Sequence, residues 1–218
     1  MTETPVPRAI LFDWDNTLVD SWPVIHDALN TTLVAYNHEP WTLQETRTRV
    51  RKSLRESFPD LFGDLWQEAA AVFYERYGNI HATMIEPISG IADLLSEISE
   101  SGIYLGIVSN KRGDFLRKEA DALAWTNYFG HIVGATDAPR DKPATDPVFM
   151  ALADSGIVPG QDVWFVGDTD IDMECAIAAN CLPVLMRAEP PEVDEFNDFP
   201  PHFHFDCAEA LCKRLRKL

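Results

Sequence analysis

Two aspartates directly follow a short apolar run near the start of the chain. Residues 9–12 are uniformly apolar (Ala-Ile-Leu-Phe), a pattern typical of a strand buried on both faces. Asp13 and Asp15 come next. Because side chains alternate along an extended backbone, both carboxylates are expected to lean to the same side, where two like charges need a cation. Although Asp is also a common turn residue, the pair is a candidate catalytic or metal-binding site.

Polar residues of particular kinds also follow three later apolar runs. They are Ser109 and Asn110 after the second run, Lys142 with Pro143 after the third, and Asp168, Asp170 and Asp172 after the fourth. The carboxyl ends of parallel strands meet at one edge of a sheet, so these residues are expected beside the first two aspartates. Carboxylate oxygens suit Mg²⁺, and a hydroxyl, an amide and an amine suit phosphoryl oxygens. The sequence therefore predicts a magnesium-assisted phosphoryl-transfer site.

The elements that would position these residues alternate from residue 87 onward. Helical stretches separate the apolar runs, and a last short strand is expected near the C-terminus. The predicted strands span residues 103–108, 131–133, 163–166, 183–186 and 203–205. This alternation predicts an α/β fold with a Rossmann-like parallel sheet covered by helices on both faces.

The segment between the first strand and residue 87 has only helical periodicity. Helices are predicted after Ser21, from the capping box at Thr42 and Glu45 to about Ser57, and over residues 64–77. Pro59 is expected to lie beyond the end of the second helix. Together they predict a small all-α cap domain over residues 19–86, inserted into an α/β core domain made of residues 1–18 and 87–218.

Composition narrows the class of partner. Eighteen basic and 35 acidic residues give a net charge of −17, which disfavours nucleic acid and anionic membranes as partners. The N-terminus lacks the pattern of a signal peptide, and no apolar run reaches membrane-spanning length. The four cysteines form no metal-ligand or redox pattern and are expected to be reduced thiols. A soluble cytoplasmic protein acting on a small phosphorylated metabolite is the expectation, with its oligomeric state open.

In order, the four polar motifs resemble those of the haloacid dehalogenase (HAD) superfamily. The motifs are DWDNT at 13–17, Ser109-Asn110, Lys142-Pro143 and GDTDID at 167–172. The resemblance extends over nearly the whole chain, in the branch with a helical cap after the first motif. Asp15 is absent from the dehalogenases themselves, so this chain is more similar to the phosphatases and phosphomutases. Its flanking sequences look most like those of phosphoglycolate-phosphatase-type hydrolases.

The resemblance implies a role for each motif. Asp13 would be the nucleophile that forms an aspartyl-phosphate, and Asp15 the general acid and then the general base. Asp13, the main-chain carbonyl of Asp15 and Asp168 would hold Mg²⁺, with Asp172 bound through water. Phosphoryl oxygens would be bound by Ser109, Asn110 and Lys142, and Lys142 would also neutralise Asp13. A phosphomutase of the β-phosphoglucomutase type and a catalytically idle binding or regulatory module remain as alternatives.

Two arginines in the second predicted helix are candidates for substrate recognition. At 100° per residue, Arg47 lies within an apolar stripe and Arg51 at its border. We expect one of them to reach the non-phosphate end of the substrate, such as a carboxylate or a second phosphate. The alternative is that both cover the surface of the cap or pair with acidic residues of the core.

Overall fold

The computed structural model describes residues 6–50 and 54–218. The chain divides into two compact units, one made of Met1–Val19 with Pro87–Leu218 and the other of Asp20–Glu86. It passes between them through β2 (Val19–Asp20) and β3 (Glu86–Pro87), which pair with each other as a two-stranded sheet. Within the described ranges, no helix has the length and apolar character needed to cross a membrane.

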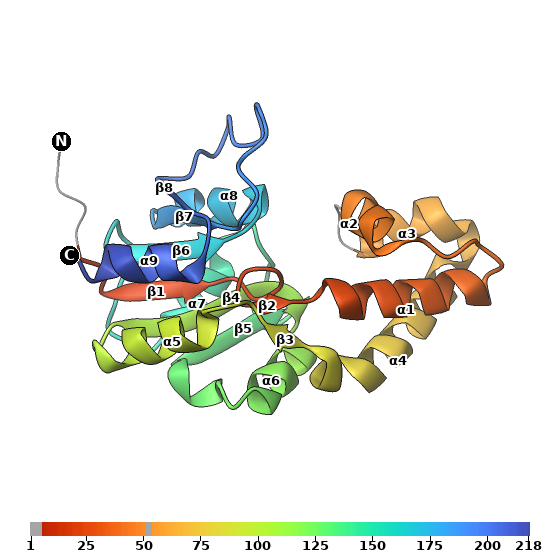
Figure 1. Cartoon of the computed structure of the whole chain (residues 1–218), viewed down its shortest axis with the longest axis horizontal. Coiled ribbons are helices and arrows are strands. Elements are labelled where there is room, and N and C mark those ends of the chain that lie inside the picture. The colour runs from red at the N-terminus through yellow and green to blue at the C-terminus, as the bar shows by residue number, and fades with distance from the viewer. Residues whose placement is uncertain (1–5, 51–53) are drawn as a thin grey trace. The chain divides into compact units, whose positions relative to one another are not determined.

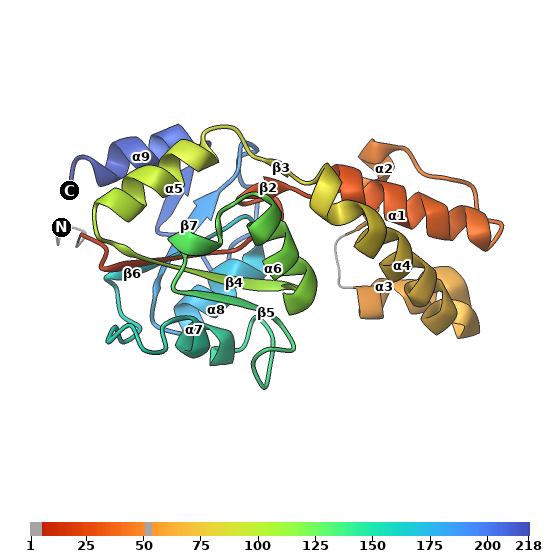
Figure 2. The same ribbon diagram turned by 90° about the horizontal axis from the view of Figure 1, so that it is seen from below.

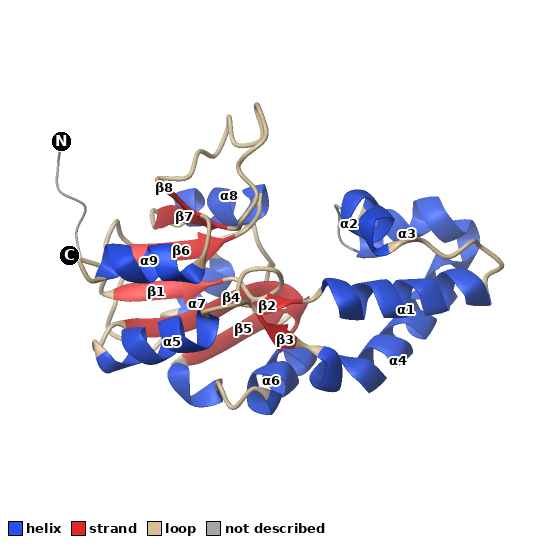
Figure 3. Ribbon diagram, viewed as in Figure 1, coloured by secondary structure: helices blue, strands red, loops and turns tan. Residues whose placement is uncertain are grey.

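The first unit is built on a six-stranded parallel sheet with the strand order β5-β4-β1-β6-β7-β8 (Figures 1 and 3). The strands are β1 (Ala9–Phe12), β4 (Tyr104–Arg112), β5 (His131–Ala135), β6 (Val163–Gly167), β7 (Leu182–Met186) and β8 (Phe203–Phe205). All four residues of β1 are fully buried, as expected for the continuous apolar run of a central strand. The predicted Rossmann-like α/β fold is confirmed.

Helices cover both faces of this sheet. In Figure 2, α5 (Ile91–Glu100) and α9 (Ala208–Leu215) lie on one side, and α7 (Asp146–Ala151) and α8 (Asp170–Ala178) on the other. The remaining helices, α6 (Gly113–Ala122) and the short η2 (Thr126–Tyr128), follow β4. Gly102 after α5 and Asn180 after α8 have φ angles of 78° and 60°, the left-handed conformation that glycine and asparagine favour just after a helix.

The strand order reverses at β1, because β4 and β5 lie on one side of it and β6 to β8 on the other. Phe12 is in register with Ile107 of β4 and with Val166 of β6. The residues that follow these positions therefore emerge together at the carboxyl edge. In open α/β sheets, ligands bind in the crevice at such a switch point.

Between the strand residues Asp20 and Glu86 at its ends, the described part of the second unit has only helices as regular elements, but they differ from the prediction. They are α1 (Trp22–Ala35), α2 (Leu43–Arg49), α3 (Leu54–Phe62), the short η1 (Gly63–Leu65) and α4 (Trp66–Met84). The helix predicted to continue to Ser57 ends at Arg49, and Pro59 lies inside α3 rather than beyond a helix. Phe58 contacts Phe62 and Phe73, with ring centroids 4.9 and 5.8 Å apart. This packing outweighs the backbone hydrogen bond that proline cannot donate.

The end of α2 at Arg49 changes the setting of Arg47. The single apolar stripe does not form, since Arg47 lies in α2 and the apolar residues from Leu54 onward lie in α3. The Arg47 side chain is 41% exposed, and its Nη2 atom is 3.9 Å from Oδ2 of Asp20. Arg51 lies outside the described residues.

Candidate active site

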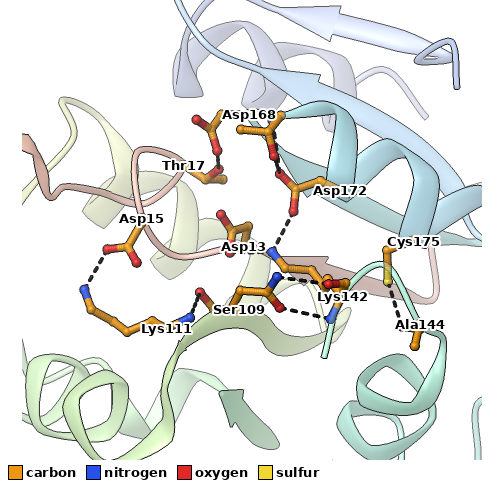
Figure 4. A network of polar contacts seen from close by, with 12 residues as sticks. Asp13, Asp15, Thr17, Ser109, Lys111, Lys142, Ala144, Asp168, Asp172 and Cys175 are labelled. Carbon is orange, nitrogen blue, oxygen red and sulfur yellow. Dashed lines mark hydrogen bonds and ion pairs between the residues drawn. The ribbon is translucent and has the colours of Figure 1, made fainter. Parts of the chain in front are cut away.

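Three carboxylates meet at the carboxyl edge of the sheet. Asp13 follows β1, Asp168 follows β6, and Asp172 lies in the first turn of α8. One oxygen from each lies within 4.8 Å of one oxygen from each of the others (Figure 4). The sequence predicts this gathering from the strand ends alone. These oxygens can serve as ligands for a hard divalent cation.

Lys142 is buried between two of these acids. Its Nζ atom donates to Oδ1 of Asp13 at 2.8 Å and to Oδ1 of Asp172 at 2.6 Å, and its side chain is 2% exposed. Burial alone would lower the pKa of Lys142, but Asp13 and Asp172 outweigh that effect and raise its pKa above the ordinary value. Lys142 is therefore a permanent positive charge against Asp13.

The charges within this cluster do not balance. Burial raises the pKa of Asp13 to about 6, and repulsion from Asp172 and Asp15 contributes, while Lys142 opposes the shift. Burial followed by repulsion from Asp172 and Asp13 also raises the pKa of Asp168. A single lysine cannot neutralise three ionised carboxylates, so a divalent cation is the partner that the residues present would fit. The all-oxygen donor set suits Mg²⁺.

The start of α8 fixes Asp172 in place. Thr169 donates from its backbone nitrogen and from Oγ1 to Oδ2 of Asp172, at 3.1 and 2.7 Å, which forms a capping box. A Cβ atom at Gly167 would lie only 2.3–2.5 Å from the Asp172 side chain. Glycine is therefore required at the end of β6 by the close approach of this carboxylate. The neighbouring Asp168 accepts a 3.2 Å hydrogen bond from Oγ1 of Thr17, which ties the loop after β1 to the same edge.

Ser109 and Asn110 lie within the last four residues of β4, which continues to Arg112 rather than ending at the predicted residue 108, and their side chains make different contacts. The Ser109 hydroxyl is buried and accepts from the backbone nitrogen of Lys111 at 3.3 Å, so its hydrogen remains available for a ligand. The Asn110 side chain accepts from the backbone nitrogen of Lys142 and donates to its carbonyl oxygen, at 2.9 and 3.0 Å. Asn110 thus holds the segment that carries Lys142. One Nδ2 hydrogen remains, and its predicted contact with phosphate stays a prediction.

Asp15 contacts a residue that the sequence reasoning missed. Lys111 donates from Nζ to Oδ1 of Asp15 and to Oε2 of Glu119, each at 2.6 Å. Trp14 donates to the same Glu119 oxygen at 2.7 Å. A signal was present, since Glu119 interrupts an apolar stripe formed by Phe115, Leu116 and Ala120 in α6. An acid in such a stripe indicates a buried cationic partner.

Arg187 was also missed. Its Nη1 atom donates to the main-chain oxygen of Asp168 at 3.0 Å and to Oε1 of Glu195 at 2.8 Å. The hydrogen bond and charge of Glu195 raise the pKa of Arg187 further above its usual value. This arginine connects the acidic loop after β7 to the backbone of a candidate metal ligand. Its sequence context in a proline-rich loop carries no signal for that role.

The fold and the site together define an α/β protein with three acids and a buried lysine at its switch point. A family model described as haloacid dehalogenase-like hydrolase matches residues 10–185. The chain therefore belongs to the haloacid dehalogenase-like hydrolases.

Individual relatives agree with this assignment. Phosphoglycolate phosphatase 1 of Pseudomonas aeruginosa is 32% identical over 186 residues, covering 81% of this chain and 68% of the relative. Phosphoglycolate phosphatase of Escherichia coli O157:H7 is 30% identical over 207 residues, covering 81% and 80%. A solved haloacid dehalogenase-like family hydrolase from Streptococcus pneumoniae has the same fold, with a TM-score of 0.84, 24% identity, and coverage of 96% of this chain and 98% of its own. The resemblance stated from the four motifs is confirmed.

Proposed function

We propose that this protein is a Mg²⁺-dependent phosphatase that hydrolyses a small organic phosphate monoester of the phosphoglycolate kind. The observation that carries the proposal is the buried Lys142, which contacts Asp13 and Asp172 where Asp168 also converges. The relatives named as phosphoglycolate phosphatases support a phosphoric monoester hydrolase. The −17 net charge fits a small substrate, met by local positive charge, better than a polyanion.

The reaction would proceed in two displacements. A carboxylate oxygen of Asp13 attacks phosphorus, the bond from phosphorus to the ester oxygen breaks, and Asp15 gives its proton to the departing oxygen. Water then attacks the aspartyl-phosphate and gives a proton to the Asp15 carboxylate, while the bond between phosphorus and Asp13 breaks. Inorganic phosphate leaves, and both aspartates return to their starting forms.

The surrounding residues would stabilise charge and fix geometry. Lys142 lowers the repulsion between Asp13 and the phosphoryl group, and Ser109 donates its hydroxyl hydrogen to a phosphoryl oxygen. Asp13 and Asp168 would hold Mg²⁺, together with the Asp15 main-chain carbonyl and Asp172 through water. When bound, the cation supplies charge neutralisation at the phosphoryl oxygens.

Selection of the substrate would belong to the helical unit, acting as a cap domain. Arg47, and Arg51 outside the described residues, are the candidates to bind the carboxylate or second phosphate of the substrate. Guanidinium groups suit such anions because they donate two parallel hydrogen bonds. The cytoplasm is the proposed location.

Replacement of the nucleophile tests this function. The wild type with Mg²⁺ is expected to release inorganic phosphate from p-nitrophenyl phosphate and from members of a panel that includes phosphoglycolate, nucleoside monophosphates and sugar phosphates. Asp13→Asn is expected to lower turnover by at least about 10³-fold, because the amide cannot attack phosphorus. Equal release of alcohol and phosphate distinguishes hydrolysis from a phosphomutase reaction. Full activity of the variant, or no activity of the wild type on the whole panel, would contradict the proposal.

A further inference from the structure

We propose that Lys111 is a positioning residue that holds the carboxylate of Asp15 for proton transfer, anchored from behind by Glu119 and Trp14. The inference rests on the proposed function, since it assigns to Asp15 the two proton transfers of phosphate ester hydrolysis. It gives roles to Lys111, Glu119 and Trp14, to which the sequence motifs assigned none. It also assigns one lysine to Asp15 and a different lysine to Asp13.

The contacts form one continuous chain from the protein core to the site. Trp14 and Glu119 are completely buried, and the Lys111 side chain is 4% exposed. Only the Asp15 end reaches solvent, with 27% of its side chain exposed. In Figure 4, Lys111 approaches Asp15 from β4, on the side away from Lys142. The Lys111 amine is therefore held by buried partners, and the partly exposed Asp15 carboxylate is the group that it can orient.

Because Glu119 is buried, we infer that its ion pair with Lys111 serves to orient the Asp15 carboxylate rather than to stabilise the fold. A buried ion pair has a large desolvation cost, and an apolar pair of similar volume would hold α6 as well or better. Removal of one partner alone leaves an uncompensated buried charge. The pair keeps the lysine amine at a fixed point 2.6 Å from Asp15, which an apolar pair could not do.

The two aspartates that follow β1 have separate lysines. Lys142 contacts Asp13 and Asp172, whereas Lys111 contacts Asp15 and Glu119. Because Lys142 supports the nucleophile independently, loss of Lys111 should impair the steps in which Asp15 gives or takes a proton. The attack of Asp13 on an ester whose leaving group departs without a proton should be slowed much less.

A substrate with a good leaving group separates these steps. p-Nitrophenolate is a weak base and departs without a proton, so its release reports the attack by Asp13. Hydrolysis of the resulting aspartyl-phosphate still requires Asp15 to take a proton from water. An alkyl phosphate requires Asp15 in both displacements, since an alkoxide needs a proton as it leaves.

The test uses the double variant Lys111→Met with Glu119→Gln, which removes both charges and keeps an oxygen to accept from Trp14. In stopped flow with p-nitrophenyl phosphate, we expect a burst of p-nitrophenolate stoichiometric with enzyme and close to the wild-type rate. The following steady state should be about 10- to 100-fold slower than in the wild type, the range that misplacement of a catalytic group produces. The loss on an alkyl phosphate should be at least as large, with KM nearly unchanged.

Asp15→Asn provides the interaction test. Once Asp15 is neutral and cannot transfer a proton, the added Lys111 and Glu119 substitutions should slow the steady state by less than about twofold. The matched control is Arg112→Met with Asp114→Asn, a neighbouring ion pair of 2.8 Å whose side chains are 44% and 48% exposed. It should leave both phases unchanged.

Lys111→Arg is the second variant, because it keeps a charge beside buried Glu119 and protects folding. Its longer planar head cannot place charge at the same point, so a smaller loss confined to the steady state is expected. Equal slowing of burst and steady state, or a loss that adds fully to that of Asp15→Asn, would overturn the inference. Absence of wild-type turnover, or turnover by Asp13→Asn, would instead overturn the proposed function.

Discussion

Asp13 illustrates how a charged side chain can be placed where its own ionisation is unfavourable. It is nine-tenths buried beside Asp168 and Asp172, and a single salt bridge to Lys142 does not restore its ordinary pKa. A free carboxylate in this position stores repulsion that a cation or a phosphoryl group can relieve. The site therefore favours binding of the species that the proposed chemistry needs.

This repulsion makes the effect of Mg²⁺ on stability depend on pH. The pKa of Asp13 is raised from 3.8 to about 6 in the folded protein. Between these two pH values, the folded state keeps a proton that the unfolded state has lost. Stability contributed by that proton is present below about pH 4 and is lost as pH rises through about 6. Because Mg²⁺ competes with protons for the same oxygens, it should raise the melting temperature more at about pH 7.5 than at about pH 5.

Thermal unfolding with and without Mg²⁺ at the two pH values measures this difference. Asp13→Asn is the control, because it removes one ionisable ligand and should reduce both the shift and its dependence on pH. Equal Mg²⁺ shifts at both pH values in the wild type would count against a cation site at these carboxylates.

At the scale of elements, the turn between β6 and α8 supplies two of the three clustered carboxylates. Gly167, Asp168, Thr169 and Asp172 lie within six consecutive residues, and the capping box that starts α8 also fixes the carboxylate that contacts Lys142. Folding of the helix start and assembly of the site are thus the same event.

Gly167→Ala should disrupt both. The added methyl group would lie within 2.5 Å of the Asp172 carboxylate and must displace it from Lys142 or Thr169. We expect a loss of about 1–3 kcal/mol in stability and about 10²-fold in turnover. Gly160→Ala, before the other end of β6, is the control and should leave turnover unchanged, because its nearest neighbour is the side chain of Asp162 at 3.0 Å. Wild-type turnover in the Gly167 variant would show that Asp172 is not needed in its present position.

The predictability of the elements followed the strength of their patterns. Continuous apolar runs predicted β1, β6 and β7 to within one residue, because buried parallel strands leave little choice of residue type. The predicted single helix from Thr42 to Ser57 was wrong, since helical periodicity alone does not show that α2 ends at Arg49. Of the residues named by motif, Asp13, Lys142, Asp168 and Asp172 lie together at the carboxyl edge of the sheet. Lys111 was missed because its contact with Asp15 spans 96 positions, although Glu119 nearby gave a signal, and Arg187 was missed because its loop carried none.

At the scale of the whole molecule, the two units divide the proposed work. The sheet unit contains the candidate residues for chemistry, and the helical unit contains Arg47 as a candidate for selection. Within the described residues, the ion pair of Arg47 is a 3.9 Å contact with Asp20 between side chains that are each 41% exposed. A surface pair of this kind adds little to stability, so Arg47 can be replaced without disturbing the fold.

Arg47→Ala should change which substrates are hydrolysed while leaving the chemistry intact. We expect about 10-fold or greater loss of kcat/KM for esters with a second anionic group, and little change for p-nitrophenyl phosphate, which lacks one. Arg49→Ala is the matched control, because Arg49 already pairs with Glu45 at 3.0 Å and lies over the ring of Trp41. Identical rate profiles of the Arg47 variant and the wild type across the panel would remove Arg47 from substrate recognition.

The pairing of β2 with β3 has a consequence for how such a protein can diversify. The helical segment leaves and rejoins the sheet unit through the paired strands β2 and β3, so the two ends of the insertion are adjacent. A different segment with the same spacing between its ends could be inserted between β2 and β3 without altering a strand of the larger sheet. Exchange of the inserted segment could therefore change substrate specificity while the candidate catalytic residues of the sheet unit keep their positions.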